Sequence, residues 1–396
     1  MCATVAAGQV RNQKPAVPAG MKLVEGKYHY LIHDLTDAEA AEVLQRMEAM
    51  VDEYSARTRE FSGRLNGKLA FMLFREPKDY YAAGGMSGSA GVYDGSKLMA
   101  IAGERLTPRT WHVIQHEGFH QFAGAVIGGD MPVWVNEGLA EYFGEAVYTG
   151  DGFVSGLIPA YRRERIAKMI AAGELKSIPE MMALSHAQWN ANLQTKNYDQ
   201  AFAMVTFLAH GDGGKYQKAF GQFIAQLNRG RQWKIAWQEA FGTADGFEKR
   251  MNEYWTKLPE QPTLEGYATA AAQMLASHLA RGDVQRQAFA DIDALKEAIG
   301  QNAVQFPRGQ ELGPALAKSC ADLVDGLEKQ GAAFSLATQG KNPQQAVVCK
   351  LKDGTTITAT YKLAGKRVGE VKSKVERPKP EKPEKAKSTG ANSAKD

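Results

Sequence analysis

Residues 107–145 constrain this chain more than any other stretch. The opening Thr-Pro pair predicts a helix start, because a hydroxyl side chain caps the first turn and proline suits the first helical position. An H-E-x-x-H motif, from His116 to His120, then lies on this helix. Residues four apart share one helix face, so both imidazoles can point at one zinc ion. Glu117 would lie beside that ion, where a carboxylate can take a proton from water.

A second helix is expected to supply what this motif lacks. The sequence G-G-D-M-P at 128–132 predicts a turn, and N-E-G-L-A-E-Y at 136–142 predicts a new helix. A catalytic zinc takes three protein ligands and keeps one position open, so Glu137 is the predicted third ligand. Glu141 lies one turn further on the same face. It is predicted to accept a hydrogen bond from a ligand histidine, with a solvated helix charge as the alternative.

The whole pattern resembles a known group of enzymes. H-E-x-x-H, a turn and then W-V-N-E-G-L-A-E-Y is similar to the gluzincin branch of the zincin metallopeptidases, in the thermolysin-like peptidase MA superfamily. Carried over by position, the resemblance implies His116, His120 and Glu137 as Zn²⁺ ligands and Glu117 as the general base. The looser patterns Y-x-Q-x-x-x-x-V-x-F-L and W-x-x-A-F-G resemble an uncharacterised bacterial branch. The resemblance covers roughly residues 27–258.

The resemblance implies zinc-dependent hydrolysis of a peptide bond in a peptide or protein substrate. Glu117 would take a proton from the attacking water and pass it to the leaving amine. The chain has no G-x-M-E-N segment of the kind that holds a substrate amino terminus in zinc aminopeptidases, which favours an endopeptidase. Two alternatives stay open: a catalytically inactive zincin-fold binding protein, and a hydrolase of a non-peptide amide. The intact Glu117 argues against the first.

Such a reaction also needs a donor that stabilises the oxyanion. Tyr198, at the start of an apolar helix, is the candidate, because gluzincin aminopeptidases place their transition-state tyrosine at a similar distance after the glutamate ligand. A tyrosine that only packs at a helix start is the alternative. His186 and His210 are the other candidates, and Tyr142 is expected to point away from the metal.

The predicted fold class is α+β. Residues 27–145 show the order strand, helix, strand, hairpin and metal helix, which resembles a zincin upper lobe with a mixed sheet. In that lobe one edge strand pairs with the substrate backbone. The glycine-rich stretch at 84–91 lacks the lysine and the context of a phosphate loop, so it is predicted as a turn. Strands are expected at 27–32 and 69–74, a capping box at 36–39, a hairpin within 92–102, and the substrate edge at 89–93 or 98–101.

The rest of the chain predicts two further units. Residues 146–258 read as a mostly helical lower lobe, in which the basic helix at 159–172 has a solvated face or directs Arg162 or Arg163 at a substrate carboxylate. Residues 259–365 predict a small α/β accessory domain. Its expected elements are helices at 264–279 and 284–299 and a hairpin that turns at Lys352-Asp353-Gly354.

Charge and cysteine content exclude several classes of protein. The net charge of +4 comes largely from the C-terminal tail, so the folded part does not favour nucleic acid. No run approaches the roughly 18 apolar residues of a membrane span. Cys2, Cys320 and Cys349 are too few for a disulfide scaffold and lie far along the chain from the histidine motif. Cys320 and Cys349 either pair in an oxidising compartment or are buried thiols.

Both ends of the chain are expected to lack a core. Residues 1–26 predict a flexible N-terminus or the remnant of a signal peptide, whose small residues favour export to the periplasm or the exterior over the cytoplasm. Residues 366–396 form a Lys/Pro/Glu tail that cannot bury enough apolar surface and is predicted to be disordered.

Overall fold

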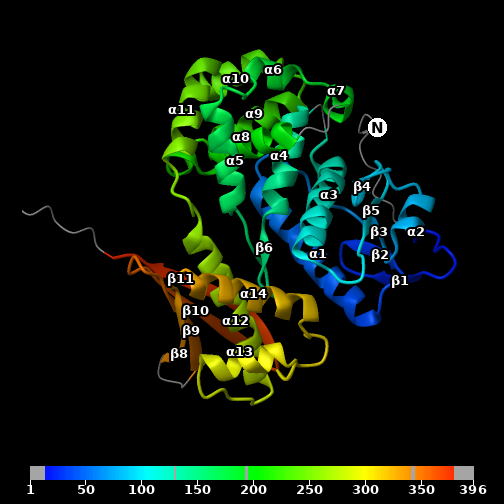
Figure 1. Cartoon of the computed structure of the whole chain (residues 1–396). Coiled ribbons are helices and arrows are strands. Elements are labelled where there is room, and N and C mark those ends of the chain that lie inside the picture. The colour runs from blue at the N-terminus through cyan, green and yellow to red at the C-terminus, as the bar shows by residue number, and fades with distance from the viewer. Residues whose placement is uncertain (1–13, 129–130, 192–194, 340–343, 379–396) are drawn as a thin grey trace, which may run out of the picture.

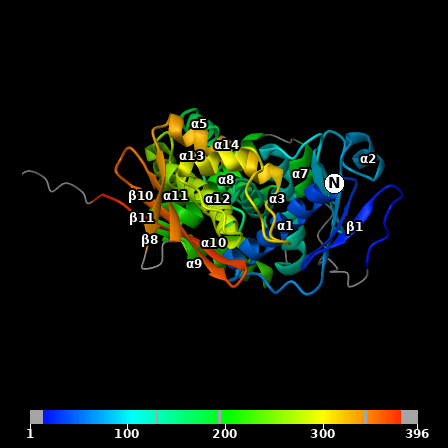
Figure 2. The ribbon, with the colours of Figure 1, turned by 90° about the horizontal axis from the view of Figure 1, so that it is seen from below.

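The computed structural model describes residues 14–128, 131–191, 195–339 and 344–378 (Figure 1). Helices combine with a five-stranded, a four-stranded and a two-stranded sheet. The two larger sheets lie towards opposite ends of the molecule (Figure 2). Among the described residues, no helix has both the length and the apolar character that a membrane crossing needs. The predicted signal remnant at 1–13, part of the predicted turn at 129–130, and the end of the tail lie outside this description.

A mixed five-stranded sheet forms the N-terminal part. Its order is β1-β2-β3-β5-β4, with β2, β3 and β5 parallel and with β1 and β4 antiparallel at the edges. The central strands are apolar almost throughout because both faces of the sheet are covered. The strands are β1 Lys22–Glu25, β2 His29–His33, β3 Leu69–Phe74, β4 Gly91–Tyr93 and β5 Leu98–Ile101.

The two edges of this sheet correct one prediction and decide between two alternatives of another. The flexible segment expected through residue 26 is wrong at Lys22–Glu25, which pairs with β2. Four residues carry too weak a pattern to mark a strand, and β2 supplies the pairing partner. Of the two candidate substrate edges, only the one that contains β4 lies at an edge, because β5 is hydrogen-bonded between β3 and β4.

Helices cover both faces of the sheet. Phe71 and Leu73 of β3 pack in the core beneath α1 and α3, whereas Met72 and Phe74 face the other side, against Tyr80 of α2. This alternation follows from the period of two in a strand. The predicted capping box that opens α1 is confirmed, as is the Thr-Pro start of α3. The helices are α1 Asp37–Thr58, α2 Pro77–Ala82 and α3 Pro108–Val126.

The following part is mainly helical, and α4 is its central element. It packs against α3 on one side and α8 on the other (Figure 1). A Cβ added at Gly138 would lie 2.5 Å from the carbonyl oxygen of Ala201 on α8, so glycine is required for this approach. The elements are α4 Val133–Gly144, β6 Val147–Tyr148, β7 Phe153–Val154, α5 Ala160–Ala171, α6 Ile178–Ala183, α7 His186–Ala191, α8 Thr195–Gly214, α9 Gln217–Asn228, α10 Trp233–Phe241 and α11 Ala244–Lys257.

The C-terminal part has its own core between three helices and an antiparallel sheet of order β11-β10-β9-β8. The predicted turn at Lys352-Asp353-Gly354 joins β9 and β10 and is confirmed. We call this part, from α12 to β11, the accessory domain. Its elements are α12 Leu264–Val284, α13 Ile292–Gly300, α14 Pro314–Lys329, β8 Ala333–Gln339, β9 Gln344–Lys350, β10 Thr356–Ala364 and β11 Arg367–Glu376.

Two predictions for this domain need correction, and the structure decides between two alternatives for its cysteines. The disordered tail expected from residue 366 is wrong at Arg367–Glu376, where β11 pairs with β10 along its length. The second predicted helix begins only at Ile292, because α12 runs on to Val284 and the chain then turns through Arg286 at φ +62°. Cys320 and Cys349 are free buried thiols, so their pairing is ruled out in this structure.

Two polar contacts join the accessory domain to the rest of the molecule. Glu42 of α1 accepts hydrogen bonds from the backbone N–H groups of Ala315 and Leu316, at 3.2 and 2.7 Å, and so caps the start of α14. Arg281 of α12 binds both oxygens of Asp151, between β6 and β7, at 2.9 and 3.0 Å. The Arg281 side chain is almost fully buried and that of Asp151 is 22 % exposed, so water reaches this bidentate pair only from the side of Asp151.

Candidate metal centre

Helix α3 brings the two motif histidines together. The Nε2 atoms of His116 and His120 are 3.1 Å apart, and the ring centroids are 4.7 Å apart. The helical repeat accounts for this proximity, since the two residues are one turn apart on one face. At such a distance the two Nε2 atoms cannot both carry a proton, so at least one presents a free lone pair.

Glu137 of α4 completes the group. Its Oε2 atom lies 3.4 Å from Nε2 of His116 and 3.4 Å from Nε2 of His120. Burial alone would raise the pKa of Glu137, but His120 and His116 outweigh it and lower the pKa to about 2. The carboxylate is therefore ionised and directed at both imidazoles.

The three atoms have the spacing that zinc requires. Tetrahedral Zn²⁺ with bonds of about 2.0–2.1 Å to N and O ligands separates those ligand atoms by about 3.4 Å. The observed separations are 3.1, 3.4 and 3.4 Å, and the three residues form one of two His/Glu groups with metal-binding geometry in the described chain. The residues predicted as ligands are thus brought together, and their N/N/O donor set fits zinc.

Gln115 holds α4 at the required distance from α3. Its fully buried side chain donates to the carbonyl oxygens of Phe143 and Ala146, at 2.9 and 3.0 Å, near the end of α4. Its Oε1 atom accepts from Arg46 of α1 at 2.7 Å, and that guanidinium stacks on Trp111 at 4.0 Å. One amide therefore ties three helices together behind the metal ligands.

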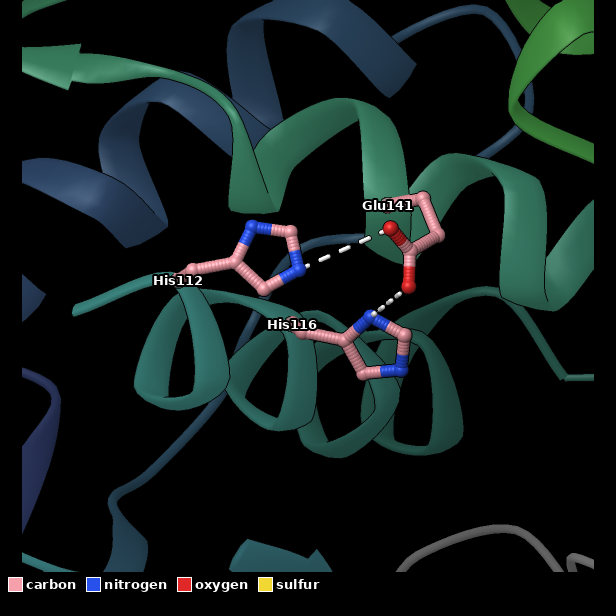
Figure 3. Close-up of side chains that lie close together, drawn as sticks. All are labelled: His112, His116 and Glu141. Carbon is pink, nitrogen blue, oxygen red and sulfur yellow. Dashed lines mark ion pairs between the residues drawn. The ribbon is translucent and has the colours of Figure 1, made fainter. Parts of the chain in front are cut away.

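Glu141 contacts one of the two candidate ligand histidines. Its Oε1 atom lies 3.3 Å from Nδ1 of His116, on the ring side opposite the Nε2 atom that faces His120 and Glu137 (Figure 3). Burial lowers the pKa of His116, but Glu137 and Glu141 outweigh it and raise the pKa well above its ordinary range. Nδ1 of His120, in contrast, is buried and has no partner among the described residues. Glu141 thus contacts the ring nitrogen of His116 that its predicted role requires, and that role stays a prediction.

Two residues missed as site residues lie behind Glu141. Nε2 of His112 is 3.5 Å from Glu141 Oε2 (Figure 3), and Nη2 of Arg162 is 2.6 Å from the same oxygen. His112 had a readable signal, because H-x-x-x-H-E-x-x-H places three histidines on one helix face. The prediction that Arg162 faces solvent or substrate is wrong, since it is buried, and Arg163 instead donates to the carbonyl oxygen of Leu258.

His112, His116 and Glu141 form the second His/Glu group with metal-binding geometry. The guanidinium of Arg162 already neutralises Glu141 from 2.6 Å. A second cation at this oxygen would meet that positive charge. We therefore interpret this group as the support of the first one.

Glu117 lies at the free edge of the sheet. Its Oε2 atom accepts a hydrogen bond from the backbone N–H of Tyr93 in β4, at 2.8 Å. The backbone N–H of Ile101 donates to the carbonyl oxygen of Ala90, and that of Asp94 donates to Lys97, so Ala90 and Asp94 direct their backbone groups towards the β5 side. Because successive residues of a strand direct these groups to opposite sides, the N–H of Tyr93 points away from β5.

A glycine allows this close approach of β4 to α3. A Cβ added at Gly91 would lie 2.5 Å from Val113 Cγ1 and 3.3 Å from Glu117 Cγ. Any larger residue at this position would push the strand away from the helix. The carboxylate predicted as general base is thereby placed beside the sheet edge.

Tyr198 of α8 lies close to His116, one of the candidate metal ligands. Its ring centroid is 6.3 Å from that of His116, and it packs edge-on against Trp189 at 5.2 Å. Burial, followed by the charge of Glu137, raises the pKa of Tyr198, so its hydroxyl keeps its proton at neutral pH. The alternative donor His210 is engaged with the Tyr142 hydroxyl at 3.0 Å.

Comparison with known proteins covers this region. Residues 111–230 match a family model described as "Protein of unknown function (DUF1570)". No curated protein matches the chain. The matched segment contains the three candidate ligands together with Glu117, Glu141 and Tyr198, whereas β4 and the accessory domain lie outside it.

Proposed function

We propose that this protein is a zinc-dependent peptidase of the gluzincin type with a zincin-like fold. The observation that carries the proposal is the triangle formed by His116 Nε2, His120 Nε2 and Glu137 Oε2, whose sides match the ligand spacing of tetrahedral zinc. A zinc ion held by these residues would act as a Lewis acid, polarising a carbonyl group and lowering the pKa of water.

Glu117 is the proposed general base. It follows His116 directly on α3, and its carboxylate is partly exposed at the edge of β4. In that place it takes the proton of the attacking water and returns it to the leaving amine. The bond to the N–H of Tyr93 leaves Glu117 Oε1 free for this exchange.

We assign substrate binding to β4, the strand at one edge of the five-stranded sheet. Gly91 directs both backbone groups, and Tyr93 its carbonyl group, away from β5, so an extended peptide can add to the sheet beside Glu117. Backbone pairing of this kind recognises a peptide irrespective of its side chains. The lack of a G-x-M-E-N segment favours cleavage within a chain over removal of its first residue.

A quenched fluorescent peptide library tests the proposal. We expect the purified protein to cleave members of the library, a chelator to abolish the cleavage, and added zinc to restore it. A zinc-loaded protein that cleaves no peptide would overturn the proposal. It would then leave the non-peptide amide hydrolase or the inactive binding protein, which a panel of amide substrates separates.

Tyr198 is the proposed oxyanion donor, and Tyr198→Phe tests it. We expect kcat to fall by about 100-fold with KM and zinc content nearly unchanged, because one lost donor costs about this much in the transition state alone. Tyr142→Phe is the matched control, since that hydroxyl binds His210 instead. A Tyr198→Phe enzyme with the kcat of the wild type would contradict this role.

A further inference from the structure

We infer that Arg162 is a positioning residue, which fixes Glu141 and through it the ligand His116. This inference rests on the metal centre of the proposed function. Arg162 lies on α5, outside both the H-E-x-x-H and the N-E-G pattern. Its side chain is only 6 % exposed, and its guanidinium stacks on the ring of Phe202 at 4.6 Å.

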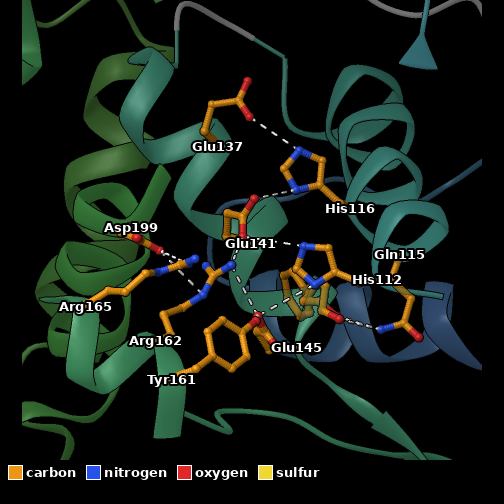
Figure 4. Close-up of polar contacts among 12 residues, drawn as sticks. His112, Gln115, His116, Glu137, Glu141, Glu145, Tyr161, Arg162, Arg165 and Asp199 are labelled. Carbon is orange, nitrogen blue, oxygen red and sulfur yellow. Dashed lines mark hydrogen bonds and ion pairs between the residues drawn. The ribbon is translucent and has the colours of Figure 1, made fainter. Parts of the chain in front are cut away.

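The guanidinium lies among three carboxylates. Its Nη2 atom is 2.6 Å from Glu141 Oε2 and 3.2 Å from Glu145 Oε1, and its Nε atom is 3.8 Å from Asp199 Oδ1 (Figure 4). The Glu141 contact is the shortest of the three. Since the side chain of Glu141 is only 8 % exposed, this ion pair is shielded from screening by solvent.

Other groups around this network fix its orientation. His112 of α3 faces both Glu141, at 3.5 Å, and Glu145, at 3.7 Å. The hydroxyl of Tyr161 donates to Glu145 at 3.0 Å. Arg165 is partly exposed, pairs with Asp199 at 2.6 Å and lies over the ring of Tyr161 at 5.1 Å. Arg162 is therefore the one guanidinium of this group that contacts the partner of His116.

The geometry connects this contact to the metal ligand. With Oε2 engaged by Arg162, Glu141 presents Oε1 to Nδ1 of His116 at 3.3 Å. A proton held on Nδ1 leaves the lone pair of Nε2 free to bind a metal. A planar guanidinium can contact Glu141 and Glu145 at once, whereas the smaller ammonium of a lysine holds them less rigidly.

A double-mutant cycle tests the inference. Zinc dissociation constants are measured by competition with a chromophoric chelator for the wild type, Arg162→Met, Glu141→Ala and the double variant. We expect Arg162→Met to weaken zinc binding by about 10–100-fold, the usual effect of losing a group that orients a metal ligand. We expect no further loss when it is added to Glu141→Ala, because Arg162 acts through that carboxylate.

Two more variants separate positioning from folding. Arg165→Met is the matched control on the same helix, and it should bind zinc like the wild type. Arg162→Lys keeps the charge and should weaken zinc binding less than Arg162→Met does. Thermal unfolding of the zinc-free proteins identifies any variant that fails to fold.

Several results would overturn the inference. One is a zinc affinity of Arg162→Met equal to that of the wild type. Another is an equal loss of zinc affinity on Arg162→Met whether Glu141 is intact or replaced by alanine. A third is failure of both Arg162 variants to fold, which would make the residue purely structural. The proposed function fails separately. A wild type that binds zinc without cleaving peptides overturns the peptidase and leaves the role of Arg162 intact.

Discussion

Replacing Glu117 with glutamine is expected to lower kcat for peptide cleavage by at least about 100-fold, the lower end of the effect of losing a general base. The amide keeps the size of the side chain, and its oxygen can still accept from the N–H of Tyr93. It cannot take a proton from water at neutral pH. Zinc content should stay at the wild-type level, because Glu117 is not one of the three ligands.

Two measurements make this prediction specific. Initial rates on a peptide selected from the library give kcat, and elemental analysis of the same samples gives the zinc content. Glu145→Gln is unsuitable as a control because Glu145 contacts Arg162, whereas Glu164→Gln changes an exposed carboxylate on the outer side of α5. Unchanged turnover in Glu117→Gln would remove this residue from the mechanism.

His120→Ala and Glu137→Ala are expected to lose bound zinc. The wild type should hold about one zinc ion per chain, and each substitution removes one of three protein ligands from a site that has no spare donor in the triangle. Peptide cleavage should disappear with the metal. Elemental analysis after extensive dialysis measures the loss.

The control for this experiment is a histidine elsewhere in the chain. His186 lies at the start of α7 and belongs to neither His/Glu group, so His186→Ala should retain zinc. Full zinc retention in both His120→Ala and Glu137→Ala would refute the ligand assignment. Full zinc retention in only one of the two variants would show that the residue replaced in it is not a ligand.

Local patterns sufficed for helix α3, which carries the H-E-x-x-H motif. A Thr-Pro start and the four-residue spacing of His116 and His120 determine one helix with two imidazoles on one face, because backbone geometry sets both. The capping box before α1 and the turn between β9 and β10 were predictable for the same reason. Each depends on residues within a few positions of one another.

Weak local patterns left other elements to tertiary pairing. β1 and β11 are edge strands with few apolar positions, and each forms because a neighbouring strand offers an open edge. The many Lys and Glu residues of β11 led to its prediction as part of a disordered tail. Backbone pairing with β10 nevertheless makes it a strand.

The sequence by itself determined which side chains can bind a metal, and the tertiary structure decided how they meet. Glu137 reaches the histidines because Gln115 ties the end of α4 to α3 and Gly138 lets α8 approach. Arg162 reaches Glu141 from α5 because their opposite charges are buried together, where water does not screen them. Such contacts depend on packing between segments far apart in the chain, which no local spacing encodes.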